Sequence, residues 1–171
     1  MKKKTFFIIA CFCCSLFTFH SSLTYGQWYW QNPLPTGSHY YDVYFINDDE
    51  GWASGQYGAV IHTIDGGITW EQQTTKTLER LWTVYFKDDM HGWTAGVYTF
   101  LRTDDGGNTW TPQDCPVSVH WRDIVFADEM HGWIVGSTGT ILNTTDGGDT
   151  WNVQQQDSSY LMNYVWFYDA I

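Results

Sequence analysis

Positive charge is scarce in this sequence. Its 171 residues include 8 Lys and Arg against 19 Asp and Glu, which gives a formal net charge of −11 at pH 7. Three of the basic residues, Lys2, Lys3 and Lys4, stand together at the N-terminus. A chain this acidic is repelled by phosphate backbones and by anionic lipid. The composition therefore argues against nucleic acid and membrane surfaces as partners.

Cysteine is nearly absent once the N-terminal stretch is set aside. Cys11, Cys13 and Cys14 lie in an apolar segment that we expect to be removed, and Cys115 is the one that remains. A single cysteine allows no internal disulfide in the mature chain.

The first 26 residues have the organisation of a secretory signal peptide. A basic start at residues 2–4 precedes an apolar stretch at 5–19, which is too short for a convincing membrane span. We expect cleavage before Gln27 and export to the periplasm, the cell surface or the medium, with no membrane insertion of the mature chain. Residues 8–11 (Ile-Ile-Ala-Cys) also look like a lipidation box, so a lipoprotein is the alternative.

Helical periodicity is absent as well, since no segment sustains a 3.6-residue period. Instead, one motif, Thr-x-Asp-Gly-Gly-x-Thr-Trp, occurs three times, ending at Trp70, Trp110 and Trp151. The three tryptophans are 40 and 41 residues apart, and a fixed period of this size marks a repeat architecture. Aromatic residues make up 19% of the chain, which suits small sheets packed face to face.

Each repeat contains four landmarks. They are an apolar strand, an acidic turn ending in Gly-Trp, a glycine turn with a short strand, and the motif followed by a polar strand. Four-stranded units of about 40 residues are the blades of β-propellers. The sequence thus predicts an all-β fold, a partial β-propeller of about three full four-stranded antiparallel blades with part-blades at both ends. The repeats are expected at residues 40–73, 81–113 and 121–154 of a domain spanning 27–171, with an incomplete fourth repeat from 162.

The first strand of each repeat is apolar on both faces, so we expect it to be buried between neighbouring blades. A propeller normally closes with four or more blades. The chain is therefore expected to be a fragment, a truncated reading frame or one part of an assembly. Open sheet edges are expected to make it self-associate.

The repeated motif is predicted to build a tight hairpin between the third and fourth strands. Its aspartate accepts hydrogen bonds from backbone N–H groups of its own turn, and its glycines supply positive φ where the chain reverses. Identical copies argue against catalysis, because an active site needs different residues that converge on one point. The residues predicted to be structural are Asp65, Gly67, Thr69, Trp70, Asp105, Gly107, Thr109, Trp110, Asp146, Gly148, Thr150 and Trp151.

These residues resemble the Asp-box, or BNR, repeat. The longer unit, Gly-Trp-x-x-Gly followed by Thr-x-Asp-Gly-Gly-x-Thr-Trp-x-x-Gln, looks most like the propellers of the photosystem II assembly and stability factor family. That resemblance covers Trp28 to the C-terminus and implies a non-enzymatic factor that binds a protein client. Asp-box propellers also include sialidases, xyloglucan-type glycosidases and sortilin-like receptors. The alternative is therefore a fragment of a secreted glycoside hydrolase of the sialidase or xyloglucanase type.

Enzymatic activity is not expected. A sialidase needs an arginine cluster for the substrate carboxylate, a tyrosine nucleophile and acidic helpers. The mature chain has only Arg80, Arg102 and Arg122, which occupy different repeat positions. No residue is therefore predicted to be catalytic.

Binding is expected on the face formed by the turns between the second and third strands and by the connections between blades. The second repeat lacks a counterpart of Gly58 and Gly139 in that turn, and loops that vary on a constant frame often carry binding. The expected function is an exported, non-catalytic scaffold that binds a protein or a glycan by aromatic stacking with a few polar contacts. The candidate binding residues are Tyr40, Tyr57, Arg80, Tyr98, His120, Trp121 and Arg122.

The acidic turns offer oxygen ligands for calcium, but their spacing matches no known calcium loop. Polar hairpin turns explain them better. His91 and His131 recur at one repeat position, so we interpret them as turn residues and not as a metal pair. No metal and no cofactor are expected.

Overall fold

The computed structural model describes residues 37–157 and 159–167. These residues belong to one compact unit, Gln31–Ile171. The predicted signal peptide lies outside the described residues. In the part of the chain that is described, no helix has the length and hydropathy needed to cross a membrane.

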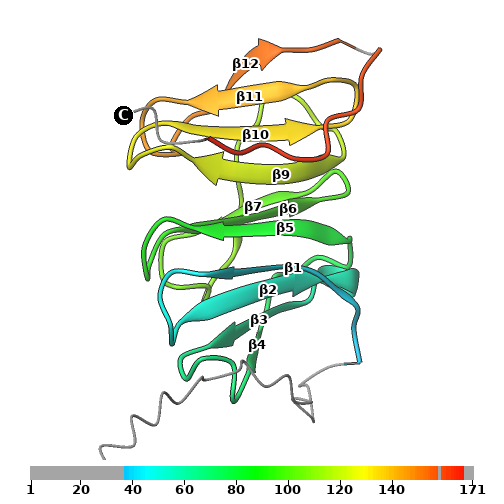
Figure 1. Ribbon diagram of the computed structural model, residues 1–171. Helices are drawn as coiled ribbons and strands as arrows, with labels where there is room; N and C mark the ends of the chain where they lie inside the picture. The colour runs from blue at the N-terminus through cyan, green and yellow to red at the C-terminus, as the bar shows by residue number, and fades with distance from the viewer. Residues whose placement is uncertain (1–36, 158, 168–171) are drawn as a thin grey trace, which may run out of the picture. The chain divides into compact units, whose positions relative to one another are not determined.

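Within the described ranges, twelve strands form three four-stranded antiparallel sheets (Figure 1). Each sheet is a blade whose strands pair in chain order. The strands of blade 1 are β1 (Tyr40–Phe45), β2 (Gly51–Gly55), β3 (Val60–Thr63) and β4 (Glu71–Gln73). Those of blade 2 are β5 (Leu81–Phe86), β6 (Gly92–Gly96), β7 (Phe100–Thr103) and β8 (Thr111–Pro112). Those of blade 3 are β9 (Trp121–Phe126), β10 (Gly132–Gly136), β11 (Ile141–Thr144) and β12 (Asn152–Gln155).

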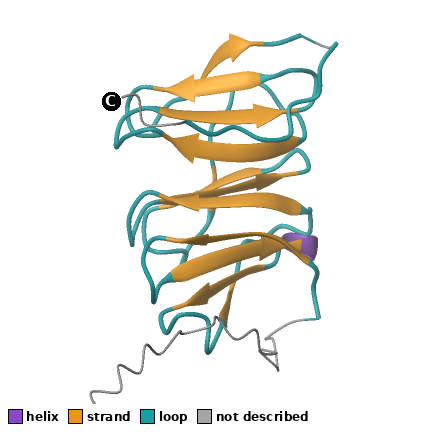
Figure 2. Ribbon diagram, in the orientation of Figure 1, coloured by secondary structure: helices purple, strands orange, loops and turns teal. Residues whose placement is uncertain are grey.

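This arrangement confirms the predicted all-β, partial propeller. The first strand of each blade contacts the first strand of the next, so β5 lies between β1 and β9. The described helical structure is the single turn η1 (Gln56–Gly58), drawn in purple in Figure 2.

The Gly-Trp pair of each repeat explains how the blades pack. A Cβ atom on Gly51 would come within 2.6 Å of the Phe45 ring, so glycine lets the phenylalanine of the first strand lie flat on β2. The tryptophan that follows packs against the next blade: the Trp52 ring stacks on Phe86 of blade 2, with centroids 3.5 Å apart. The same repeat position gives the contact of Trp93 with Phe126, at 4.8 Å.

The Asp-box motif folds as a hydrogen-bonded turn. In the first copy, the backbone N–H of Thr69 donates to Asp65 Oδ1 at 2.8 Å, and the Thr69 hydroxyl donates to Asp65 Oδ2 at 2.6 Å. Thr63 Oγ1 accepts the N–H of Gly67, whose φ is 83°. The other two copies repeat these bonds. The polar side chains of the motif therefore form hydrogen bonds within the motif itself.

The motif also joins the blades, which the sequence did not predict. The Gln73 side chain donates to the carbonyl of Gly106, at 2.8 Å, and accepts from the indole N–H of Trp110, at 3.3 Å. The indole of Trp52 donates to the same Gly106 carbonyl at 3.2 Å. The glutamine of Trp-x-x-Gln thus links one blade to the box of the next.

The expected burial of the first strand is right for β5 and β9 and wrong for β1. Val84 and Phe86 are 2% and 0% exposed, whereas Val43 and Phe45, at the same repeat positions, are 56% and 39% exposed. The reason is that blade 1 covers β5, while no described strand precedes β1.

Of the predicted fourth repeat, the structure describes the residues up to 167, and these form an extended segment. Residues 159–167, red in Figure 1, run across blade 3 without forming a strand. Even so, the N–H of Val165 donates to Asp123 Oδ2 at 2.8 Å, and the ring of Phe167 lies 4.3 Å from that of Trp133. The segment therefore takes the place that the first strand of a next blade would occupy.

Candidate functional site

The connections divide the blades into two faces. The turns between second and third strands bond to the connections between blades, as in Gly58 N–H to the Glu79 carbonyl, at 2.7 Å, and Val97 N–H to the Arg80 carbonyl, at 2.9 Å. We name this side the loop face. The Asp-box turns bond instead to the acidic turns, as in Gly66 N–H to the backbone carbonyl of Asp49, at 2.8 Å. They form the opposite side, which we name the box face.

Three residues at one position of the loop face have a left-handed backbone. The φ angles of Tyr57, Tyr98 and Thr138 are 59°, 50° and 57°. This region is uncommon for residues other than glycine and costs on the order of 1–3 kcal/mol. Both tyrosines are exposed, at 66% and 65%. The turns thus hold two aromatic rings in solvent at a cost in backbone strain, and such strain concentrates at functional sites.

Four side chains on the loop face are in contact, and we name them the loop-face cluster: Trp82, Tyr98, His120 and Arg122. Trp82, near the start of β5, lies at its centre. The Arg122 guanidinium lies 3.9 Å above the Trp82 ring centroid, in a cation–π contact. His120 packs edge-on against both Trp82, at 5.6 Å, and Tyr98, at 4.5 Å. The buried Nε of Arg122 has no acceptor among the described residues.

Two hollows of about 550 Å³ each adjoin the cluster and share Trp82. The first is lined by Tyr41, Asp42, Trp82, Arg122, Asp123, Asn163 and Tyr164. The second is lined by Gln56, Tyr57, Leu78, Glu79, Arg80, Trp82, Val97 and His120. An extended ligand that crosses Trp82 would reach both.

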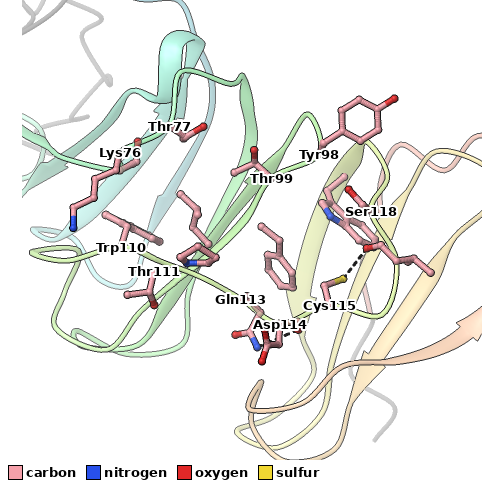
Figure 3. A pocket seen from close by; sticks show the side chains of 16 residues that line it. Lys76, Thr77, Tyr98, Thr99, Trp110, Thr111, Gln113, Asp114, Cys115 and Ser118 are labelled. Carbon is pink, nitrogen blue, oxygen red and sulfur yellow. Dashed lines mark hydrogen bonds between the residues drawn. The ribbon is translucent and has the colours of Figure 1, made fainter.

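A third cleft, of about 650 Å³, opens beside Tyr98 between the two blade connections (Figure 3). Lys76 and Thr77 come from the connection between blades 1 and 2, and Asp114 and Cys115 from the next connection. The Cys115 thiol donates to the carbonyl of Val117 at 3.1 Å, and burial raises the pKa of this thiol. The cysteine is therefore held as a neutral wall residue.

Most of the predicted binding residues gather around Trp82. Tyr57, Arg80 and His120 line the second hollow, Arg122 lines the first, and Tyr98 lines the third cleft. Tyr40, at the start of β1 opposite Gly55, lines none of these spaces.

Trp121 was predicted as a binding residue of the loop face, and it lines the inner wall of the third cleft. Its side chain is only 1% exposed, and its ring packs 6.1 Å from Phe100 in the core of blades 2 and 3. Trp82 was missed, although one signal could have found it. Tyr41, Trp82 and Arg122 share one repeat position, and three different side chains there mark a place where the repeats stop agreeing.

Positive charge is unevenly distributed over the two faces. Beyond residue 26 the basic residues are Lys76, Arg80, Lys87, Arg102 and Arg122. Lys87 and Arg102 bind the Asp-box of blade 3, through the Gly147 carbonyl at 3.2 Å and Asp149 Oδ1 at 2.6 Å. The other three line the loop-face spaces. The loop face therefore concentrates the free cations of an acidic chain.

The carboxylates of the acidic turns accept hydrogen bonds from the backbone of the same turns. Asp128 Oδ1 accepts the N–H groups of Met130, at 2.8 Å, and His131, at 2.7 Å, and these bonds lower the pKa of Asp128. Asp88 and His91 repeat the arrangement. Within residues 37–157 and 159–167, no three His, Cys, Asp or Glu side chains gather as a metal ion would require.

Four-stranded blades closed by Asp-box hairpins define a β-propeller of the Asp-box class. The sequence model of one family, described as Photosynthesis system II assembly factor YCF48, matches residues 20–112 and 108–168. The chain belongs to this family.

Three photosystem II assembly factors are similar to this chain at 30% identity or more. The Photosystem II stability/assembly factor HCF136, chloroplastic, of Cyanidioschyzon merolae is 44% identical over 52 residues, which are 29% of this chain and 12% of that protein. A structure of YCF48 bound to a D1 peptide has a TM-score of 0.62 at 30% identity, over 72% of this chain and 42% of that one. YCF48 from Cyanidioschyzon merolae has a TM-score of 0.61 at 30% identity, over 72% and 40%. The chain thus spans less than half the length of these relatives.

Enzymes share the fold at lower identity. An ancestral GH74 enzyme has a TM-score of 0.60 at 17% identity, over 80% of this chain and 21% of that one. The GH74 enzyme of Niastella koreensis has a TM-score of 0.59 at 18% identity, over 73% and 24%. These likenesses show the propeller fold alone.

Proposed function

We propose that this chain is an exported, non-catalytic interaction module that binds an extended segment of a protein partner on its loop face. The observation that carries the proposal is the stacking of Arg122 on Trp82 between two hollows, with His120, Tyr57 and Tyr98 beside them. Support also comes from the relative whose structure contains a D1 peptide.

A peptide suits the chemistry of this cluster. Aromatic rings such as Tyr57 and Tyr98 give a large contact area and are amphipathic, so they pack on side chains and hydrogen-bond to a peptide backbone. A guanidinium stacked on a ring keeps its in-plane N–H groups for carbonyl or carboxylate oxygens. Arg80 and Lys76 on the same face can pair with a carboxylate of the segment, and Asp42, Asp123 and Glu79 can pair with a basic residue.

Peptide binding is tested by fluorescence anisotropy with a labelled D1 peptide, and by selection from a displayed library of random peptides. Trp82→Ala and Arg122→Ala are expected to weaken binding by roughly tenfold or more each, because stacked aromatic and arginine anchors typically dominate an interface. Ile64→Ala, an exposed residue of the box face, is the matched control and should leave binding unchanged. Failure of both the D1 peptide and the library to bind the loop face would contradict the proposal.

A glycoside hydrolase remains the second candidate because two carboxylates line one hollow. Asp42 and Asp123 both face the first hollow, and burial raises the pKa of Asp123, as a general acid requires. However, Asp42 accepts the N–H groups of Val43 and Val84, both at 2.9 Å. Carboxylates occupied by backbone donors favour a structural role.

The hydrolase is tested with xyloglucan oligosaccharides and a sialoside as substrates. No turnover is expected from the purified chain. Turnover that is lost in both Asp42→Asn and Asp123→Asn would replace the proposed function with a hydrolase.

Export is supported by the signal-like residues 1–26 alone. A fusion of these residues to alkaline phosphatase, which is active only outside the cytoplasm of a bacterial host, tests it. We expect activity with the intact segment and none when its apolar stretch at residues 5–19 is deleted. An inactive intact fusion would contradict export.

A further inference from the structure

The outer face of β1 is an apolar surface that no described residue covers. Val43 and Phe45 point to this face, and they are far more exposed than Val84 and Phe86, their counterparts in blade 2. The other side of β1 is occupied, because Tyr44 packs on Tyr85 of blade 2 at 4.7 Å. The exposed side is the one that a preceding blade would cover.

The exposed Phe45 ring has the same orientation as its buried counterpart Phe86. Its ring lies edge-on to Trp70, with centroids 6.0 Å apart and an interplanar angle of 85°. The buried Phe86 makes the same contact with Trp110, at 5.9 Å and 90°. The β1 face is therefore preorganised, and docking would require no rearrangement of this ring.

The two blade contacts within the chain show what kind of surface covers such a face. Each surface presents the tryptophan of a Gly-Trp pair, Trp52 on Phe86 and Trp93 on Phe126. Blade 1 adds a carboxylate, since Asp42 accepts the N–H of Val84. A partner for β1 therefore needs a projecting indole with a carboxylate nearby.

Blade 3 carries such a surface, formed by Trp133 and Asp123. Residues 165–167 occupy it, with Phe167 on Trp133 and the N–H of Val165 on Asp123. Unlike β5 and β9, this segment pairs with no strand, and Trp166 in its middle is 73% exposed.

We propose that β1 of a second copy of this chain docks on blade 3 in place of residues 165–167. Phe45 of one copy then stacks on Trp133 of the other, as Phe86 stacks on Trp52 within the chain. Because the two surfaces lie on different blades of one chain, the contact is head-to-tail, and such contacts form a closed ring when the rotation permits. The three blades that the structure describes would then give six blades from two copies, within the four to eight blades of known propellers.

Charge distinguishes a second copy from other occupants. Two copies each carry a formal net charge of −11, so their long-range repulsion opposes association. Salt screens this repulsion, whereas the contact itself is apolar. The dimer is therefore expected to tighten as salt increases, whereas a basic protein partner would be released.

The test is sedimentation velocity of the full chain over a range of concentrations. The unsubstituted chain is expected to dimerise, and Val43→Asp is expected to be monomeric because it places a carboxylate in the apolar contact. Ile64→Asp, equally exposed but on the box face, is the matched control and should dimerise as before. Circular dichroism melts establish that each variant folds. Phe167→Ser frees Trp133 and should tighten the dimer by roughly three- to tenfold, the value of one aromatic contact.

Mixing distinguishes a head-to-tail contact from a symmetric one. Val43→Asp and Trp133→Ala should each be monomeric alone and should form a dimer when mixed, because one intact contact remains. A monomer at all concentrations, a dimer that persists in Val43→Asp, or no dimer on mixing would overturn the proposal. So would a monomer whose β1 amides are protected from hydrogen exchange, because the residues that precede β1 would then cover the face.

Discussion

Asp42 of β1 accepts the backbone N–H of Val84 in β5, at 2.9 Å, across the boundary between two blades. The same carboxylate accepts the N–H of Val43, so one side chain holds the first strands of both blades. Asp123 repeats the arrangement with Ile124 and Val165. The inner strands are therefore joined by carboxylates, in addition to the aromatic contacts between blades.

Asp123→Asn is expected to keep or raise stability at pH 7. Burial raises the pKa of Asp123, and the charge of Asp42 adds to the effect. A raised folded-state pKa favours the protonated form, so its stabilising contribution is present below the unfolded pKa and is lost as pH rises through the folded pKa. Asparagine resembles the protonated carboxyl, because it carries no charge and keeps one acceptor oxygen for the N–H groups of Ile124 and Val165. Its melting temperature should match or exceed that of the unsubstituted chain at pH 7, and the gap should close toward pH 4.

The control for this prediction is Asp123→Ala, which removes the acceptors of two backbone N–H groups. It should lose about 1–3 kcal/mol at both pH values. If Asp123→Asn is as destabilising as Asp123→Ala at pH 7, the carboxylate charge stabilises the fold and the predicted sign is wrong.

The Asp-box carboxylates should show the opposite pH dependence. Hydrogen bonds from the Thr150 hydroxyl and backbone lower the pKa of Asp146 to about 2, and the pKa values of Asp65 and Asp105 are also lowered. A lowered pKa gives stability above the unfolded value of 3.8 that is lost as pH falls through the folded value. The chain should therefore lose stability between pH 4 and pH 2, as seen in thermal melts.

Asp146→Asn isolates one box in the same melts. It should lower stability at pH 7 by about 1–2 kcal/mol, because an amide cannot accept from Thr144, Thr150 and the backbone as a carboxylate does. It should also flatten the loss of stability below pH 4. An unchanged slope would mean that other groups cause the acid destabilisation.

Gln73→Ala should destabilise the contact between blades 1 and 2. The substitution removes two bonds, to the Gly106 carbonyl and from the Trp110 indole, and leaves that buried indole N–H without an acceptor. A loss of about 1–3 kcal/mol in denaturant unfolding is expected. Gln72→Ala, on the exposed neighbouring residue, is the control and should change stability by less than about 0.5 kcal/mol. Equal effects of the two substitutions would contradict the role of Gln73.

The repeat period predicted the blades because each repeat contains the residues that form its own turns. Gly-Trp begins the second strand of each blade, and Asp-Gly-Gly forms the hairpin between the third and fourth strands. Both signals are local in the sequence. Contacts between blades are not local. The bonds of Gln73 to Gly106 and of Asp42 to Val84 join residues 33 and 42 positions apart, so reading one repeat at a time could not find them.

The candidate site was predicted in part for the same reason. Tyr57 and Tyr98 were found because they stand in a turn that changes length between repeats. The burial of Trp121 could not be predicted, because a register shift at Val135 and Gly136 displaces the pairing at the start of β9 and simple alternation fails there. Trp82 was missed because a tryptophan in an apolar strand has the composition of a core residue.

Tyr98→Gly should separate binding from stability. Tyr98 has a φ of 50°, which glycine adopts without steric strain, so relief of strain offsets the greater freedom of the unfolded chain. Stability should stay within about 1 kcal/mol of the original value or rise above it. Peptide binding should weaken by roughly tenfold, because the ring that packs on His120 is lost. The two quantities are measured by thermal melts and by anisotropy with the same peptide.

Thr138→Gly is the matched control, because Thr138 has the same left-handed backbone at the same repeat position but carries no ring. It should leave peptide binding unchanged. If Tyr98→Gly weakens binding no more than Thr138→Gly does, the tyrosine contributes only its backbone conformation. The strain at Tyr57 and Tyr98 would then need an explanation other than the presentation of aromatic rings to a partner.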